Sequence, residues 1–320
     1  DYSLFVSYFP LLVAGPIERA THLLPQVKIR RTFNFEQGKE GVRLIVFGLF
    51  KKVVVADNCG FFADQLFNDY QNHSALELWM GAFLFAFQIY GDFSGYTDIA
   101  RGVSKLLGIE LLKNFNFPYF SKDIADFWRR WHISLSTWFR DYVYIPLGGS
   151  KGSKALQIRN VFIIFLISGF WHGANWTFII WGAIHAMLFL PLLLLNKNRT
   201  NRSQDHYSFR DLPAVLLTFV LVCIAWVFFR ADHVSDAVGY LKGMFAWNDM
   251  TLAFFTKNAK FILLTAITLF SVVVLNVIEW QNFRRIGELY LSKKLVLLII
   301  AMILLMGVFR NPASFIYFQF

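Results

Sequence analysis

The chain has 320 residues, of which 56% are hydrophobic and 18% aromatic, and its mean hydropathy is +0.47. A soluble domain of this length is more polar, so the composition excludes an ordinary soluble protein and indicates a polytopic membrane protein. The net charge is +10, but lysines and arginines stand between apolar stretches. That pattern indicates charge kept on the cytoplasmic side of a membrane rather than binding to nucleic acid.

The N-terminal stretch predicts a broken membrane element. Pro10 and the Gly15-Pro16 pair interrupt the apolar residues 2–17, and residues 18–40 form a polar, basic loop with a short helix. The chain begins without Met and is apolar almost at once, so we expect further helices before it in the full protein. No repeat or linker divides the sequence, and we expect one domain over 1–320.

Residues 41–57 predict an apolar helix that is interrupted by Lys51 and Lys52. Such lysines in a membrane helix must extend to the interface or line a cavity. The following residues, 58–75, contain acidic residues but neither Lys nor Arg. The positive-inside rule therefore predicts that they form an outward-facing segment.

Residues 76–99 predict the next membrane span. Gly91 and Gly95 form a G-x-x-x-G pair, which permits close helix packing. Asp92 lies between them, within or near the hydrocarbon, where an ionisable residue is by default a candidate for function. The alternative is that Asp92 only holds scaffold hydrogen bonds, and we favour this structural interpretation while keeping Asp92 as a candidate binding residue.

Residues 100–160 contain no clear span, and ten basic residues predict that they are cytoplasmic. Placed on a helix, the aromatic residues around position 132 fall on a stripe about 120° wide. This predicts an interfacial helix with an aromatic face and a basic face. The stripe consists of Trp128, Trp131, His132, Leu135, Trp138, Phe139 and Tyr142, and the basic face of Arg129, Arg130 and Arg140.

Two apolar segments, 158–171 and 174–195, meet at His172-Gly173. The first is too short to span a bilayer alone, so the pair is either one long kinked helix or a re-entrant turn followed by a span. In both cases Gly169 and Gly173 free the backbone around His172.

Three further spans are predicted at 212–229, 261–278 and 295–309. The final residues, 312–320, are too aromatic for a free tail, and we expect them to pack at the membrane interface. The two cysteines, Cys59 and Cys223, form no metal motif, and a disulfide is not expected because Cys223 lies in an apolar stretch.

Histidine is the best candidate for chemistry, because the sequence lacks the motifs of nucleotide-binding loops, zinc proteases and serine hydrolases. His172 lies between Trp171 and Trp176 and could act as a general base, or it could be a core histidine bonded to a carbonyl at the kink. His132 is a weaker candidate, and His185 is interpreted as a packing contact. Arg129, Arg130 and Arg140 could hold the phosphate of an anionic donor, although charge anchoring explains at least some of them.

Three motifs follow one another in order, with Gly-Asp-Phe-Ser-Gly-Tyr-Thr-Asp at 91–98, the tryptophan-rich segment at 127–141, and Ser-Gly-Phe-Trp-His-Gly-Ala-Asn-Trp at 168–176. Together with the turn at 15–19 and the aromatic end at 315–320, they resemble the membrane-bound O-acyltransferase (MBOAT) family. The resemblance is to its bacterial branch, which includes alginate O-acetyltransferases (AlgI) and teichoic-acid D-alanyltransferases (DltB).

The resemblance implies an all-α polytopic membrane protein, a ring of transmembrane and re-entrant helices around a central funnel. It implies transfer of an acyl group, most often acetyl, from a cytoplasmic thioester (acetyl-CoA or an acyl carrier protein) to a hydroxyl of an extracytoplasmic polysaccharide or partner protein. No bound cofactor or metal is expected, a periplasmic acetyltransferase is an expected partner, and the expected location is the bacterial inner membrane.

The same resemblance assigns roles to residues. His172 matches the catalytic histidine of the family, and His132 its second motif histidine near the donor. Candidate substrate-binding residues are Trp128, Arg129, Arg130, Trp131, Trp171, Asn175, Trp176 and Asp92. Two other functions stay open, namely a transporter or flippase of an activated acyl group, and a non-catalytic scaffold of a polysaccharide export complex.

Overall fold

A computed structural model describes residues 1–198, 207–246, 249–284, 289–310 and 315–316. Throughout these residues the regular elements are helical, as the sequence predicts for an all-α membrane protein. The α-helices are α1 Tyr2–Val6, α2 Ala20–Lys28, α3 Phe35–Leu49, α4 Asp57–Asn68, α5 Ala75–Leu106, α6 Ile124–Arg130, α7 Ile133–Phe139, α8 Lys154–His172, α9 Trp176–Leu194, α10 Leu212–Arg230, α11 Val234–Met244, α12 Ala253–Thr256, α13 Ala259–Phe283 and α14 Lys293–Met306.

Helices α8, α9, α10 and α13 are long and apolar enough to cross a membrane. The predicted spans 212–229 and 261–278 correspond to α10 and α13, and 295–309 to the shorter α14. The expectation that 158–171 is too short to span is wrong, because α8 begins at Lys154 and has 19 residues. Within the described part of the chain, this number of membrane-length helices confirms a polytopic protein.

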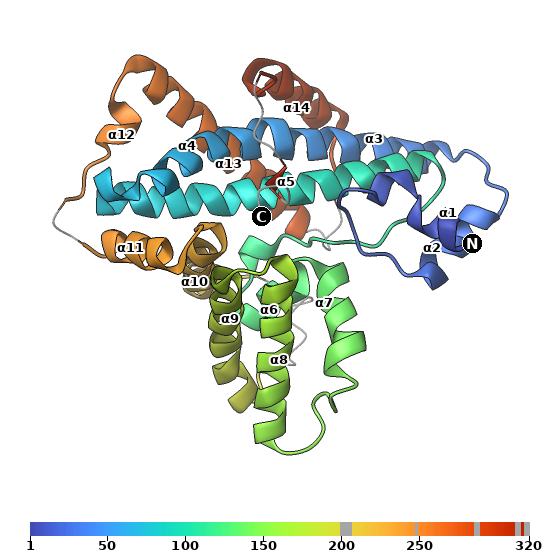
Figure 1. The fold of residues 1–320 in the computed structure, drawn as a ribbon. Coiled ribbons are helices and arrows are strands. Elements are labelled where there is room, and N and C mark those ends of the chain that lie inside the picture. Colours follow the sequence, from blue (N-terminus) through green and yellow to red (C-terminus); the bar gives the residue numbers. More distant parts are fainter. Residues whose placement is uncertain (199–206, 247–248, 285–288, 311–314, 317–320) are drawn as a thin grey trace.

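Helices α8 and α9 form an antiparallel hairpin, which Figure 1 shows projecting away from the long α3–α5 pair. This is neither of the two predicted arrangements, since two separate helices meet at a tight turn, 173–175. The glycines permit contact between the helices rather than a kink. A Cβ on Gly169 would lie 2.3 Å from the carbonyl oxygen of Phe178, and one on Gly182 would lie 2.3 Å from that of Phe165.

The stretch 58–75, which the sequence predicts to face outward, is helical for most of its length. The backbone of α3 continues through a π-helical segment, Phe50–Ala56, directly into α4, so only residues 69–74 connect α4 to α5. The G-x-x-x-G pair does allow close packing, as predicted. A Cβ on Gly95 would lie 2.7 Å from the carbonyl oxygen of Gly48 on the antiparallel helix α3.

Lys51 is buried between helices in a network of charges. Its Nζ lies 3.0 Å from Asp98 on α5 and 3.2 Å from Glu279 on α13. The hydroxyl of Tyr90 donates to the same Glu279 carboxylate at 2.6 Å. Lys51 therefore joins three helices through paired charges, and it also lines a cavity, as one of the predicted alternatives required.

Lys52 forms a second, neighbouring network. Its Nζ lies 2.9 Å from Asp57 and 2.9 Å from Asp92. The other oxygen of Asp92 accepts the backbone N–H of Ile316 at 2.7 Å. Most of the aromatic segment 312–320 lies outside the described residues, but Ile316 is buried and Phe315 packs against Tyr96.

The predicted interfacial helix around position 132 is wrong as a continuous element. Helix α6 ends at Arg130, and α7 starts at Ile133, after His132 has adopted a left-handed backbone conformation with φ 44°. The basic face is not uniform either, because Arg130 is 3% exposed. The two free cysteines are both buried, in agreement with the sequence.

Candidate active site

His132 is held in place by the side chain of Asn114. The amide oxygen of Asn114 lies 3.0 Å from Nδ1 of His132, and it also accepts the hydroxyl of Ser134 at 2.9 Å. It further accepts the backbone N–H of Ser134 at 3.3 Å, and the backbone oxygen of Asn114 accepts the N–H of Ile133 at 2.8 Å. Because an oxygen faces Nδ1, that nitrogen carries the proton and Nε2 keeps its lone pair.

The surroundings of His132 keep it uncharged. The side chain is 3% exposed and packs edge-on against Phe93, with ring centroids 4.7 Å apart. Burial, followed by the nearby His172, lowers the pKa of His132 well below its usual value. A neutral imidazole in this position can accept a proton.

His172 ends α8 at the turn of the α8–α9 hairpin, where it is partly buried. Its ring lies 5.3 Å from that of Trp181 and 5.0 Å from that of Phe229, both almost perpendicular to it. Trp181 and Phe229 are themselves buried. The histidine thus lies in an aromatic environment that excludes water on two sides.

The two histidines flank one tryptophan. The ring of Trp171 lies 5.0 Å from that of His172 and 6.3 Å from that of His132. Two candidate histidines 40 positions apart in sequence are therefore neighbours of a single side chain. Trp176, in contrast, is 72% exposed, so the aromatic walls of His172 are Trp181 and Phe229 rather than the predicted Trp176.

Asn175 anchors the hairpin turn. Its side-chain oxygen accepts the N–H of Thr177 at 3.1 Å and so caps α9, while its amide donates to the backbone oxygen of Asp232 at 2.8 Å. These bonds fix the turn that follows His172 to the start of α11. Asn175 therefore positions His172 indirectly, by holding the backbone of the turn that follows it.

The four candidates on α6 and just after it divide into two groups. Trp128 and Arg129 line a cavity, with Nε1 of Trp128 also donating to Nδ1 of His185 at 3.3 Å and Arg129 to the backbone oxygen of Asn198 at 3.1 Å. Arg130 instead pairs with Asp126 at 3.0 Å inside the protein. Trp131 is 4% exposed and packs in the aromatic core.

That cavity has a volume of about 680 Å³ and separates α6 and α7 from α8. We call it the α7–α8 cavity. Arg129 and Arg140 line it together with apolar side chains such as Phe139 and Phe165. Ser168, one turn before His172, also belongs to its wall. The cavity combines two guanidinium groups with a long apolar surface that leads toward the hairpin turn.

A second cavity, of about 440 Å³, is lined by charged side chains of α3 and α5 and by residues of the segment 110–117. This α3–α5 cavity includes the buried Lys51 and borders Phe115, whose ring lies 6.4 Å from that of His132. This cavity could not be predicted from the sequence, because the charged residues that line it come from segments far apart in the chain. They are Glu40, Arg43, Lys51, Asp98, Arg101, Lys105, Glu110 and Lys113.

The carboxylate of Asp92 is engaged by Lys52 and by the backbone N–H of Ile316, as described above. His185 is fully buried among Phe127, Trp128 and Trp181, which agrees with its interpretation as a packing residue. Asn114 was missed by sequence reasoning, because nothing in a single asparagine of a connecting segment indicates that it will bond a histidine 18 positions later.

The described residues form an all-α membrane protein in which a buried histidine, His132, and a partly buried one, His172, both lie beside Trp171. The family model of the membrane-bound O-acyltransferases matches residues 1–231, and the chain belongs to this MBOAT family. A peptidoglycan O-acetyltransferase of Helicobacter pylori is 43% identical over 263 residues, 81% of this chain and 49% of that protein. A Pseudomonas aeruginosa protein named "Probable alginate O-acetylase AlgI" is 42% identical over 253 residues, 79% of this chain and 47% of that protein.

A teichoic acid D-alanyltransferase of Bacillus subtilis is more distant, at 29% identity over 237 residues, which are 70% of this chain and 60% of that protein. The similarity thus extends to both kinds of bacterial relative that the sequence motifs suggested. The chain spans about half the length of the peptidoglycan and alginate relatives that it matches.

Proposed function

We propose that this chain is the core of a membrane O-acyltransferase of the bacterial inner membrane. The enzyme transfers an acyl group, acetyl in the first instance, from a cytoplasmic thioester to a hydroxyl of an extracytoplasmic polysaccharide or of a periplasmic acetyltransferase partner. Family membership and the names of the relatives support the reaction class. The single observation that carries the proposal is the placement of His132 and His172 on either side of Trp171.

The α7–α8 cavity supports the entry of the donor. Acetyl-CoA and an acyl carrier protein both present the thioester on a phosphopantetheine arm, so both need a cation for the phosphate and an apolar path for the arm. Arg129 and Arg140 supply the cations, and the wall that leads to Ser168 supplies the path. Arg140 is well exposed and pairs with the adjacent Asp141 at the surface, so it is accessible to an anion.

The charge distribution supports a cytoplasmic donor side. Lys154 donates to Asn196 at the end of the hairpin opposite His172, and Lys151 and Lys197 lie in the same connections. The turn 173–175 carries no charge, and it contacts the connection that contains Asp232. By the positive-inside rule the basic end faces the cytoplasm, and His172 faces the acceptor.

The chemistry then needs one proton carrier. The imidazole of His172 removes the proton from the acceptor hydroxyl, and the oxygen attacks the thioester carbonyl carbon. The carbon–sulfur bond breaks, and the leaving thiolate takes the proton from the imidazolium, so that an ester and a thiol are formed. His132, across Trp171, lies on the donor side. The aromatic walls reduce the access of water, which would otherwise compete as acceptor.

The test uses the full-length parent protein in membranes together with its export partners. A labelled acetyl donor is supplied on the cytoplasmic side, and label on the external glycan is counted for wild type, His172→Ala and the exposed control His233→Ala at matched expression. Loss of transfer only in His172→Ala supports the proposal. Transfer that persists in His172→Ala contradicts a base role, and export of free label without any ester on the glycan supports a transporter.

A further inference from the structure

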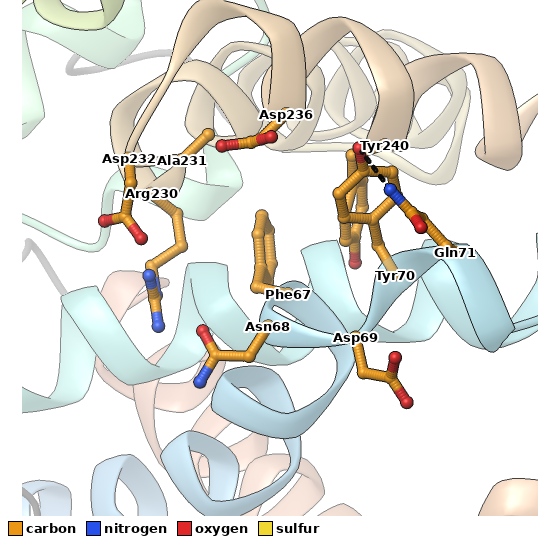
Figure 2. Close-up of a pocket in the computed structure, with 10 residues that line it drawn as sticks. All are labelled: Phe67, Asn68, Asp69, Tyr70, Gln71, Arg230, Ala231, Asp232, Asp236 and Tyr240. Carbon is orange, nitrogen blue, oxygen red and sulfur yellow. Dashed lines mark hydrogen bonds between the residues drawn. The ribbon is translucent and has the colours of Figure 1, made fainter.

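A third cavity, of about 440 Å³, lies between the end of α4 and the turn from α10 to α11. We call it the α4–α11 cavity. Figure 2 shows the ring of Phe67 at its centre, with Arg230, Asp232 and Asp236 on the α10–α11 side and Asn68 on the α4 side. Neither the predicted site nor the mechanism above uses these residues.

The α4–α11 cavity adjoins the catalytic turn. Asp232, in its wall, accepts the amide of Asn175 through its backbone oxygen at 2.8 Å, three residues after His172. On the other side, Arg230 follows Phe229, whose ring lies 5.0 Å from that of His172. A ligand in this cavity would therefore lie against two residues that connect to His172, namely Asp232 through Asn175 and Arg230 through Phe229.

The lining offers groups that recognise hydroxyls. Asn68 and Gln71 provide amides, and Tyr70 provides a phenol that accepts a weak hydrogen bond from Gln71 at 3.5 Å. Phe67 and Tyr240 stack with centroids 4.2 Å apart and supply a rigid aromatic wall. Amides, carboxylates and an aromatic surface together suit a sugar, which has hydroxyls at its edge and C–H groups on its faces.

The charge of the lining selects among glycans. Asp69, Asp232 and Asp236 contribute three carboxylates, whereas the single guanidinium, Arg230, is paired with Asp64 at 2.9 Å. A chain of uronates or phosphates would bring further negative charge against these carboxylates, which is unfavourable. Among the residues that the structure describes, no three carboxylates, histidines or cysteines are grouped to hold a metal ion, so the acids are not a cation site.

We infer that the α4–α11 cavity binds a neutral, hydroxyl-rich segment of the glycan acceptor and presents it to His172. The inference rests on the proposed function, because it names the substrate class that the same enzyme would acylate. It adds that the acceptor is uncharged along the bound segment rather than a polyuronate or a polyphosphate.

Binding is measured on the purified full-length parent protein in nanodiscs, without acyl donor, by saturation-transfer NMR. The probes are cellopentaose, a mannuronate pentamer and pentalysine. We expect wild type to bind cellopentaose and not the mannuronate. The exposed pair Asn68→Ala/Gln71→Ala should weaken cellopentaose binding about tenfold through lost hydrogen bonds. Asp232→Asn/Asp236→Asn should admit the mannuronate, while Asp249→Asn, which makes the same kind of change outside the cavity, should not.

Equal cellopentaose binding by wild type and Asn68→Ala/Gln71→Ala would overturn the inference, as would tighter binding of the mannuronate by wild type. Binding of pentalysine alone would overturn it in favour of a basic protein partner. Because no acyl donor is present, the binding measurement does not depend on catalysis by His172. A failure of His172 as base therefore leaves this measurement intact, and absent binding in a protein that still transfers acetyl defeats only the inference about the cavity.

Discussion

Asn114 fixes the conformation of His132. Its side-chain oxygen faces Nδ1 of the histidine at 3.0 Å, and its backbone oxygen accepts the N–H of the next residue, Ile133, at 2.8 Å. A left-handed backbone conformation at a non-glycine residue costs about 1–2 kcal/mol. The two hydrogen bonds to Asn114 offset that cost. The bond to Nδ1 also determines that Nε2 of the imidazole keeps its lone pair.

Asn114→Ala should therefore impair transfer more than it impairs folding. The free energy of unfolding should fall by about 1–3 kcal/mol, because the buried imidazole N–H and the Ser134 hydroxyl lose their acceptor. Transfer should fall at least tenfold at matched protein level. Asn116→Ala is the control, since that side chain lies in the same connecting segment but accepts from Lys113, at 2.8 Å, instead of facing His132. Normal transfer by Asn114→Ala would show that the orientation of His132 is unimportant.

His132 also predicts how stability depends on pH. Burial lowers its pKa in the folded protein, so below about pH 6.5 the unfolded chain binds a proton that the folded chain does not. Stability present above that pH should be lost as the pH falls, by up to about 1.4 kcal/mol per pH unit from this residue.

The comparison is between wild type and His132→Asn, because asparagine tolerates the left-handed conformation. Unfolding in detergent at pH 7, 6 and 5 should show a smaller loss of stability in the variant. Parallel pH profiles for the two proteins would mean that His132 is not held neutral.

The buried network of charges around Lys51 predicts that removal of this one charge strongly lowers the stability of the protein. Lys51→Met removes the cation nearest to Glu279 and Asp98, and breaking a buried pair of this kind costs about 3–5 kcal/mol. The double variant Lys51→Met/Glu279→Gln should recover part of that loss. Lys39→Met, which removes a surface pair with Glu36, should cost less than about 1 kcal/mol. Thermal unfolding in detergent measures all three, and similar losses at Lys51 and Lys39 would contradict the network.

Close packing of the α8–α9 hairpin predicts that one methyl group disturbs the site. A Cβ at position 169 would lie 2.3 Å from a backbone oxygen of α9, so Gly169→Ala must separate the helices near His172. We expect a loss of stability of about 1–3 kcal/mol and reduced transfer. Ile167→Ala changes a residue on the exposed face of the same turn and should retain transfer. Transfer by Gly169→Ala at the level of Ile167→Ala would refute this account.

The spans were predictable because hydropathy reports the bilayer directly, as α10 and α13 illustrate. His172 could be singled out as a candidate because Gly, Trp and His interrupt an apolar stretch. The break before α7 could not be found, because the residue that stabilises it, Asn114, lies in a segment without regular structure. The roles of Lys51 and Lys52 could not be predicted for a related reason, since their carboxylate partners include residues of α5 and α13, which lie far from them in the sequence.

The two oxygens of Asp92 hold segments that the ribosome makes far apart in time. One accepts Lys52, from the helical segment made just before, and the other accepts the N–H of Ile316, 224 positions later in the chain. Helices α3 to α5 can therefore leave the insertion machinery with Asp92 already paired with Lys52. The second oxygen of Asp92 then still lacks the hydrogen bond from Ile316. Membrane insertion of these helices can start without the segment that contains Ile316. The complete set of contacts around Asp92 forms only after synthesis of the chain has reached Ile316.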